Sequence, residues 1–361
     1  MKLNVLIYVL AVIVASTTIT SCDNALEVTP KYKEDYLNSN KSEDYYKALR
    51  EYKKTDHAVS FGWFGNWTGV GASLSNCMAA LPDSVDFVSM WGGWKNPTPK
   101  MLEDLRFVQE KKGTKALVCF IILDIGDQIT PNEYSQSLDD RKKYWGWIDN
   151  DKGAIEKSIR KYANAICDTI DKYDYDGFDL DWEPSYAQPF NTHKEIVPYI
   201  DIFIDEMSKR IGPDSGTDKL FVIDGEPDHE NIPAEYGKKF NYFISQAYGC
   251  RSYTNLDNRI FSVIEKYKGV MSIEEIAKKF IVCENFESYS ANGGVSHNTR
   301  EGKNVTSLLG MAYWNPIVDG KMYRKGGVGT FHMEYEYYLS NQSGTYPYLR
   351  KSIQIMNPNI Q

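Results

Sequence analysis

The strongest constraint on the fold of this chain is a short run in which acidic and apolar residues alternate. Positions 176–183 read DGFDLDWE. Successive side chains of a strand point to opposite faces, so Asp179, Asp181 and Glu183 share one face. Neighbouring carboxylates repel one another unless water, a metal or a substrate relieves the repulsion. The same crowding moves their pKa values apart, as acid–base chemistry on one substrate requires.

A solvated acidic edge strand is the alternative interpretation of this run. Phe178, Leu180 and Trp182 argue against it, because they suit a strand that is buried on its second face. The run therefore predicts a buried strand whose acidic face carries the function.

Length and charge narrow the class of protein. The chain has 361 residues, of which 42% are hydrophobic, which is enough for one domain of barrel size. The formal net charge of −8 argues against a nucleic-acid partner, because such proteins usually carry a basic stripe. The 26 Tyr and 8 Trp suit sugar rings and ordinary cores equally well, so they do not decide the ligand.

The first 22 residues are typical of an export signal. Lys2 supplies the positive charge, and an apolar segment runs from Leu3 to Ala15. The following Ile-Thr-Ser-Cys, which ends at Cys22, resembles the lipobox of bacterial lipoproteins. A transmembrane helix is the alternative, but the apolar segment is short for a membrane span. The resemblance implies lipidation at Cys22 and a protein anchored to a bacterial membrane, with the outer membrane or the cell surface as the expected place.

The other five cysteines predict neither a metal site nor a disulfide framework. They form no CxxC pair, no His cluster accompanies them, and their number is odd. We expect Cys119, Cys250 and Cys283 to be small core residues.

The rest of the chain alternates between apolar strand-like runs and helical patterns. Eight candidate strands are Ala58–Phe64, Val85–Trp91, Ala116–Leu123, Gly177–Trp182, Leu220–Asp224, Tyr242–Tyr248, Phe280–Cys283 and Leu308–Trp314. The clearest helices between them are Pro99–Lys111, Lys152–Lys172, Lys194–Ile211, Leu256–Lys268 and Ile273–Lys279. This alternation predicts an α/β fold, a (β/α)8 TIM barrel. A doubly wound open sheet is the competitor, but no Gly-rich phosphate loop follows the first strand.

We expect a single folded domain behind a short tether. Residues 1–22 are the signal, residues 23–56 the tether, which becomes helical near Ser42 to Lys54, and residues 57–361 the barrel. The acidic run is then the fourth strand. Active sites of such barrels lie at the C-terminal ends of the strands, which places Glu183 at the mouth and Asp179 deeper.

The acidic run matches the DxxDxDxE signature of family 18 glycoside hydrolases, which include chitinases and endo-β-N-acetylglucosaminidases. The resemblance implies that Glu183 is the general acid and that Asp181 orients the 2-acetamido group of the substrate. Asp179 would hold Asp181 and share a proton with it. We expect Asp176, the first acidic residue of the signature, to contribute to substrate binding. The implied reaction is retaining and substrate-assisted, and it requires no metal and no organic cofactor.

The end of the sixth strand distinguishes members of that family. Gln246 and Tyr248 stand where its chitinases usually show Met-x-Tyr-Asp, and the pair looks more like the endoglycosidases that cut the chitobiose core of N-glycans. By this resemblance the Tyr248 hydroxyl donates to the acetamido oxygen and Gln246 donates and accepts. An ordinary polar residue at a strand end is the alternative for Gln246. The third strand also lacks the Ser-x-Gly-Gly of many chitinases.

Other strand ends offer aromatic and polar side chains. By resemblance, Trp314 at the end of the eighth strand would form the floor under the sugar ring, and a buried core Trp is the alternative. We expect Trp63, in the aromatic stretch that ends the first strand, to contact substrate. Asp224 and Glu226 end the fifth strand and are expected to add polar contacts.

Three functions remain open at this point. The first is an endo-β-N-acetylglucosaminidase that acts on N-glycans, which the Gln246–Tyr248 pair and the lipobox favour. The second is a chitinase. The third is a surface glycan-binding lipoprotein without catalysis, against which the presence of Glu183 argues.

Overall fold

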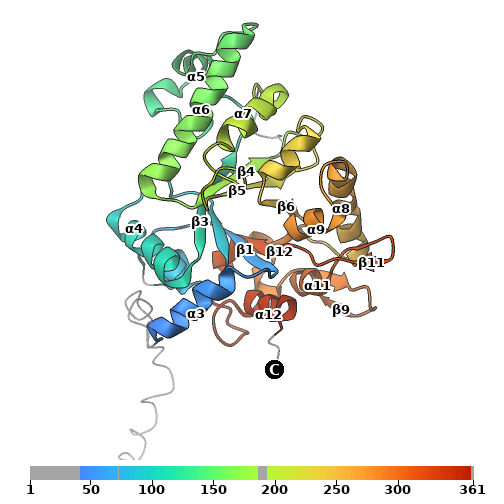
Figure 1. Cartoon of the computed structure of the whole chain (residues 1–361). Helices are drawn as coiled ribbons and strands as arrows, with labels where there is room; N and C mark the ends of the chain where they lie inside the picture. The colour runs from blue at the N-terminus through green and yellow to red at the C-terminus, as the bar shows by residue number, and fades with distance from the viewer. Residues whose placement is uncertain (1–40, 72, 186–192, 359–361) are drawn as a thin grey trace, which may run out of the picture.

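Eight parallel strands close into a barrel, in the spatial order β1-β12-β7-β6-β5-β4-β3-β2 (Figure 1). The computed structural model describes residues 41–71, 73–185 and 193–358. The expected signal, Cys22 and most of the expected tether lie outside the described residues. The barrel strands are β1 Val59–Phe64, β2 Phe87–Met90, β3 Lys115–Ile121, β4 Gly177–Trp182, β5 Leu220–Gly225, β6 Tyr242–Gln246, β7 Phe280–Asn285 and β12 Gly327–Phe331. This architecture confirms the predicted (β/α)8 barrel.

Helices surround the barrel and alternate with its strands. They are α3 Glu43–Lys53, α4 Pro99–Arg106, α5 Leu138–Trp145, α6 Lys152–Tyr173, α7 Ile200–Met207, α8 Tyr253–Tyr267, α9 Ile273–Lys279, α10 Phe286–Tyr289, α11 Ser307–Tyr313 and α12 Pro347–Met356. Two small hairpins, β8 Ser296–Asn298 with β9 Asn304–Thr306 and β10 Ile317–Val318 with β11 Lys321–Met322, lie outside the barrel. Both α5 and α6 extend beyond the barrel at the top of Figure 1. No helix in the described part of the chain is both long and apolar enough to cross a membrane.

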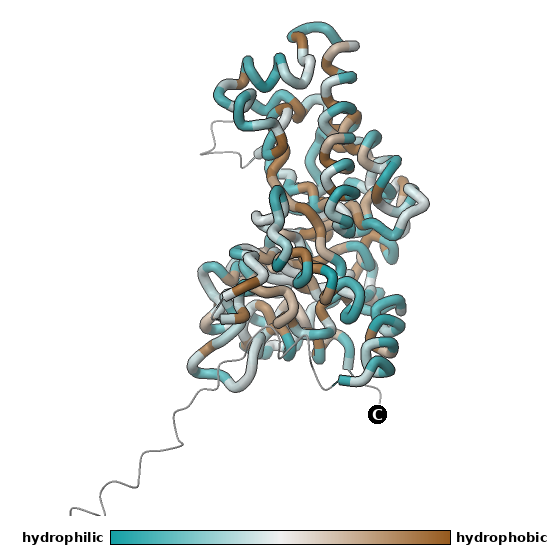
Figure 2. The backbone as a smooth tube through the Cα atoms, turned by 90° about the vertical axis from the view of Figure 1, so that its left-hand side faces the viewer, coloured by the Kyte–Doolittle hydropathy of each residue, from teal (hydrophilic) through white to brown (hydrophobic). Residues whose placement is uncertain are grey.

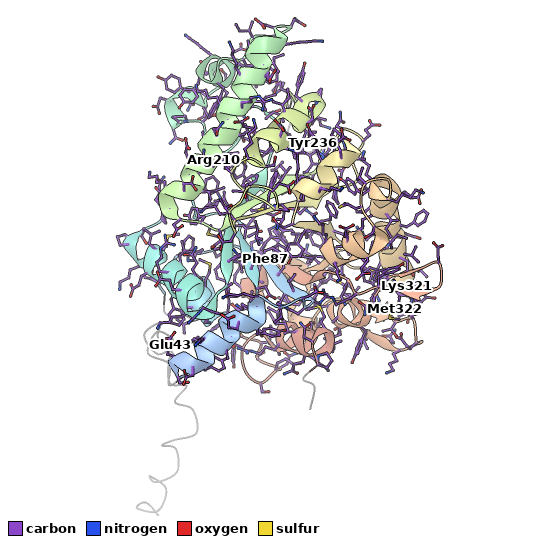
Figure 3. The ribbon with its side chains drawn as sticks, viewed as in Figure 1. Glu43, Phe87, Arg210, Tyr236, Lys321 and Met322 are labelled. Atoms are coloured by element: carbon purple, nitrogen blue, oxygen red, sulfur yellow. The ribbon has the colours of Figure 1, made fainter. Side chains whose placement is uncertain are left out.

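Apolar side chains fill the inside of the barrel and the layer between barrel and helices. Phe61, Phe87 and Tyr242 stack across the interior, with ring centroids 4.7 and 5.3 Å apart. Figure 3 shows Phe87 at the centre of the molecule, and Figure 2 shows hydrophobic residues concentrated along its middle. The expected core residues Cys119, Cys250 and Cys283 are buried and free. The interior is therefore a packed core that supports a site at one end.

The eighth strand is not where the sequence pattern placed it. Residues 308–313 belong to helix α11, and β12 closes the barrel instead. Residues 307–312 are all buried, so the segment shows none of the periodicity that separates a buried helix from a strand. Strand β12 is short and contains two glycines, which weaken a strand pattern. Gly329 is needed because a Cβ there would lie 2.5 Å from the Phe61 ring.

The predicted helix near residues 42–54 is present as α3 and packs against the barrel. Ser42 caps its start by accepting from the Tyr45 backbone N–H. Near its end, Lys53 Nζ donates to the Val85 carbonyl at 2.5 Å and to Thr114 Oγ1 at 2.8 Å. These partners lie just before β2 and β3, so α3 covers the end of the barrel where the strands begin.

Candidate active site

Strand β4 carries its acidic side chains into the barrel. Asp179 and Asp181 are buried, whereas Glu183 is half-buried at the mouth. The alternate residues Phe178, Leu180 and Trp182 pack outward in the main hydrophobic core. The alternation predicted from the sequence is therefore confirmed.

The fifth strand adds a fourth acid group. Asp224 is directly opposite Asp181 in the parallel pairing of β4 and β5 and is fully buried. Oxygen atoms of Asp181, Glu183 and Asp224 lie within 4.8 Å of one another. Just after Asp224, Gly225 has a φ of +83°, and a Cβ there would lie 2.8 Å from Glu183 Cγ. This glycine therefore leaves the space that Glu183 occupies.

Gln246 joins the two strands at the mouth. Its side-chain amide donates to Glu183 Oε1 at 2.6 Å and to Asp224 Oδ1 at 2.8 Å. Because one amide group donates to both acids, it fixes the orientation of Glu183 and partly neutralises the repulsion between the two carboxyl groups.

Burial raises the pKa of every acid in the cluster. For Asp181 and Asp224 burial raises the pKa well above the usual value, and the neighbouring acids add to the effect. Burial raises the pKa of Asp179 to about 6. The pKa of Glu183 is also raised by burial, lowered by the Gln246 amide and raised by the charge of Glu226. The site therefore holds protons in the range where ordinary carboxyl groups have lost them.

An aromatic wall stands beside the acids. Burial raises the pKa of Tyr248 well above its usual value, and the charges of Asp224 and Asp181 add to this shift. The Tyr248 ring lies 6.1 Å from the ring of Phe331 at the end of β12, and Phe331 lies 5.8 Å from Trp91. Phe331 thus holds the strand-end position that the sequence pattern assigned to Trp314.

Trp314 is not part of this site. It follows α11, outside the barrel, where its indole N–H donates to Asp257 on α8 at 2.9 Å. Its ring packs 6.3 Å from Phe280. The prediction of a substrate floor at Trp314 is wrong because it depended on the misplaced eighth strand.

Asp176 is not at the substrate end of the barrel either. Its carboxylate accepts from the Ala116 backbone N–H at 2.8 Å and from Gln109 Nε2 at 2.7 Å. It precedes β4, whereas the acids lie at the C-terminal end of that strand, so the predicted substrate contact is wrong. Asp176 instead links the start of β4 to β3 and the segment after α4.

Trp63 lies below the site. It is 1% exposed, packs inside the barrel against Phe61 and approaches Phe331 at 6.1 Å. The indole N–H of Trp63 is among the groups that lower the pKa of Asp179. Its position supports the acids from beneath and leaves almost no surface for a substrate.

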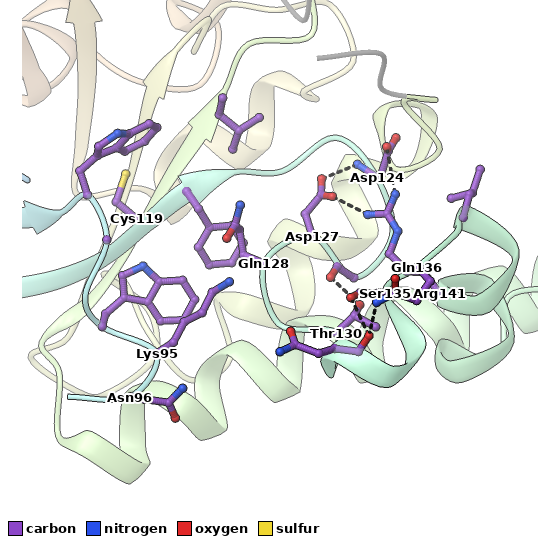
Figure 4. Close-up of a pocket in the computed structure, with 18 of the residues that line it drawn as sticks. Lys95, Asn96, Cys119, Asp124, Asp127, Gln128, Thr130, Ser135, Gln136 and Arg141 are labelled. Atoms are coloured by element: carbon purple, nitrogen blue, oxygen red, sulfur yellow. Dashed lines mark hydrogen bonds and ion pairs between the residues drawn. The ribbon is translucent and has the colours of Figure 1, made fainter. Parts of the chain in front are cut away.

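A groove opens beside the acid cluster. It has a volume of about 1070 Å³ and lies between the loop after β2 and the loop after β3. Figure 4 shows Cys119 and Lys95 at one end and Arg141 at the other. Arg141 donates to Asp127 at 2.7 Å and lies 3.5 Å from Asp124, so its charge is satisfied within the wall. A groove of this size fits several sugar residues, since drug-sized ligands need about 300–1,000 Å³.

The oxygen grouping of Asp181, Glu183 and Asp224 is also a set that could hold a divalent cation. We expect protons and the Gln246 amide to relieve the repulsion instead, because burial raises the pKa of all three acids. The absence of a metal requirement stays a prediction.

The sequence pattern did not identify Phe331 or the partnership between Asp181 and Asp224. Phe331 follows two glycines in a strand with a weak pattern. The Asp224 partnership depends on the β4–β5 register, in which Asp181 and Asp224 are paired. An acidic residue at the end of the next strand was the available signal for it.

Comparison with known proteins agrees with this geometry. The family model "Glycoside hydrolase family 18, BT1044-like" matches residues 23–355. The solved structure "BT1044SeMet", of a variant in which Gln replaces a Glu, superposes with a TM-score of 0.74 at 33% identity and covers 92% of this chain and 98% of that one.

Two further relatives are named as endoglycosidases. "Endo-beta-N-acetylglucosaminidase F2" of Elizabethkingia meningoseptica is 27% identical over 326 residues, or 86% of this chain and 85% of that protein. The endo-beta-N-acetylglucosaminidase of Cordyceps militaris shares the fold, with a TM-score of 0.60 at 20% identity over 89% of this chain and 98% of that one. The protein belongs to glycoside hydrolase family 18, in its BT1044-like group.

Proposed function

We propose that this glycoside hydrolase is an endo-β-N-acetylglucosaminidase that cleaves the β-1,4 bond in the chitobiose core of N-glycans. The observation that carries the proposal is the position of Glu183, at the barrel mouth above Asp181 and joined by Gln246 to Asp224. The likeness to relatives named as endo-β-N-acetylglucosaminidases supports the choice of substrate.

Glu183 supplies the proton in the first step. Burial raises its pKa and so favours the protonated form, which can protonate the glycosidic oxygen as the bond to the anomeric carbon breaks. The substrate's own acetamido oxygen forms the new bond to that carbon, which gives an oxazolinium ion with inverted configuration at the anomeric carbon.

The buried acids stabilise the positive charge that develops on the acetamido group. Asp179, Asp181 and Asp224 lie close enough to share protons, so a carboxylate can form at Asp181 as the charge appears on the nitrogen. The Tyr248 hydroxyl donates a hydrogen bond to the acetamido oxygen. Water then attacks the anomeric carbon and gives a proton to Glu183, while the bond from that carbon to the acetamido oxygen breaks and restores the acetamido group. The two successive inversions retain the configuration.

The test is mass spectrometry of glycans released from a mixed glycoprotein by the protein without residues 1–22. We expect released glycans that end in a single N-acetylglucosamine. The Glu183→Gln variant should lose at least about 10²–10⁴-fold in turnover, the usual contribution of a general acid. Near-normal turnover in this variant would reject the role of Glu183. Cleavage of chitin oligomers without any glycan release would support the chitinase alternative.

We further propose that the mature protein is a lipoprotein attached through Cys22. The lipobox-like sequence supports this, as does the family match, which begins at residue 23. Fractionation of cells that express the full chain should find it in the membrane, and Cys22→Ser should move it to the soluble fraction. An unmodified N-terminal peptide that still contains residues 1–21 would contradict the proposal.

A further inference from the structure

A second hollow lies in the described part of the chain and shares no lining residue with the groove of Figure 4. It has a volume of about 440 Å³ and is formed by the loops that follow β1 and β12 and by residue 290 after α10. Asn66, Asn76 and Ser75 contribute amide and hydroxyl groups, and Tyr335 and Tyr338 contribute rings. All these loops leave the C-terminal ends of barrel strands, so the hollow opens at the same end as the acids.

The walls of the hollow are held together by one buried carboxylate. Glu334 is 3% exposed and accepts from the Gly65 backbone N–H at 3.0 Å, from Asn66 Nδ2 at 3.2 Å and from His332 Nδ1 at 2.8 Å. The loops after β1 and β12 are thereby joined. A ligand would meet an already formed surface, which reduces the entropy cost of binding.

A continuous series of rings connects this hollow to the reaction centre. The ring of Tyr248 lies 6.1 Å from Phe331, Phe331 lies 4.4 Å from His332, and His332 stacks on Tyr335 at 4.7 Å. A glycan whose cleaved sugar lies against Tyr248 therefore meets an unbroken aromatic surface that leads into the hollow.

The chemistry of the hollow selects neutral, hydroxyl-rich ligands. Tyr335 is 41% exposed and Tyr338 is 69% exposed, so both rings offer an accessible face to a sugar ring. No Lys or Arg is among the described residues of its lining, and the charged group behind it is the carboxylate of Glu334. An anionic sugar would find no cation here and would face a negative field.

We propose that the hollow bounded by Tyr335 and Tyr338 is a binding subsite for a neutral sugar residue of the substrate glycan, outside the N-acetylglucosamine pair that is cut. The identity of the ligand as part of the substrate depends on the proposed function. The subsite explains the Tyr-rich stretch of residues 334–338, for which the sequence pattern offered no function.

Binding can be measured without turnover in the Glu183→Gln protein. The probes for calorimetry are two free neutral N-glycans, one high-mannose and one galactose-terminated biantennary, with chitobiose as the short control. In Glu183→Gln combined with Tyr335→Ala and Tyr338→Ala, the tighter-binding neutral glycan should lose about 10–100-fold in affinity, roughly tenfold for each ring contact. Chitobiose binding should stay within about twofold. Phe261→Ala is the matched control, because Phe261 is a 57% exposed ring on the distant helix α8.

Three results would overturn the subsite: unchanged affinity for the neutral glycans, an equal loss for chitobiose, or no binding of either neutral glycan before the tyrosines are replaced. The proposed function is tested by a separate measurement: it is rejected if wild type and Glu183→Gln release the same amount of glycan. In the active protein the two Tyr substitutions should raise KM for a glycopeptide about tenfold and leave kcat within about twofold.

Discussion

Gln246 tunes the pKa of Glu183, the proposed general acid. Its amide donates to Glu183 and favours the ionised form, so it lowers the pKa of Glu183 against the effect of burial. Glu226, two residues beyond Asp224, acts in the opposite direction through its charge. Gln246 and Glu226 therefore have opposite effects on the pKa of Glu183, and removing each should move its titration in opposite directions.

Replacing Gln246 by Leu removes the donor to Glu183 and to Asp224. The pKa of Glu183 should rise, so the protonated acid persists to higher pH and the alkaline limb of the kcat/KM profile moves to higher pH. Because a hydrogen bond to a charged group is lost, kcat/KM at the optimum should fall by about tenfold or more. A pH profile of glycan release measures both effects, and an unmoved alkaline limb would show that Gln246 does not tune the acid.

Glu226→Gln removes a negative charge near Glu183 and keeps an oxygen for the Ser185 backbone N–H, which Glu226 Oε1 accepts at 3.0 Å. The pKa of Glu183 should fall, so the alkaline limb should move to lower pH, opposite to Gln246→Leu. The same pH profile serves as the measurement. A shift in the same direction for both variants would mean that a general disturbance of the site, rather than electrostatics, is responsible.

At the scale of elements, strand β4 was predictable and strand β12 was not. Residues 178–183 alternate strictly between apolar and acidic side chains, and the strand predicted at Gly177–Trp182 has the observed bounds. The segment 308–314 is apolar throughout, which a buried helix and a buried strand satisfy equally well. Asp176 shows a second limit of prediction from sequence. It matches the first acidic position of the signature, but it precedes β4 and therefore lies at the end of the barrel opposite to Glu183.

The corrected position of the eighth strand leads to a test with paired aromatic variants. Phe331→Ala removes the ring that contacts Tyr248 and Trp91, and kcat/KM should fall about tenfold. Trp314→Phe keeps an aromatic ring outside the barrel, and kcat/KM should stay within about twofold. Steady-state kinetics on a glycopeptide distinguish the two, and a larger loss for Trp314→Phe would restore the original assignment.

At the scale of the whole molecule, buried lysines make stability depend on pH. Lys325 is 2% exposed and donates to the carbonyls of Ala312 and Trp314 at 2.8 and 2.7 Å, at the end of α11. Burial lowers its pKa from 10.5 to about 7. The unfolded chain therefore binds a proton more readily than the folded one between these values, and the free energy of unfolding gains from this group as pH rises.

Lys325→Met should remove that contribution. The free energy of unfolding of the wild type should increase more steeply between pH 7 and pH 10 than that of the variant, by a difference of at most about 4 kcal/mol over the range. Urea denaturation at several pH values measures the two slopes. Parallel slopes would show that Lys325 titrates at an ordinary pKa in the folded protein.

The position of α3 shows at which end of the barrel the described part of the chain begins. This helix covers the end of the barrel where the strands begin, and the first described residue, Lys41, directly precedes it. In Figure 1 α3 and the last helix, α12, both lie at the bottom, away from the α5–α6 extension. The folded part of the chain thus begins at the base of the barrel, and the acids lie at its opposite end. If the chain is anchored at Cys22 as proposed, we expect the mouth to stay open to glycans carried by other molecules, because the described chain begins away from it.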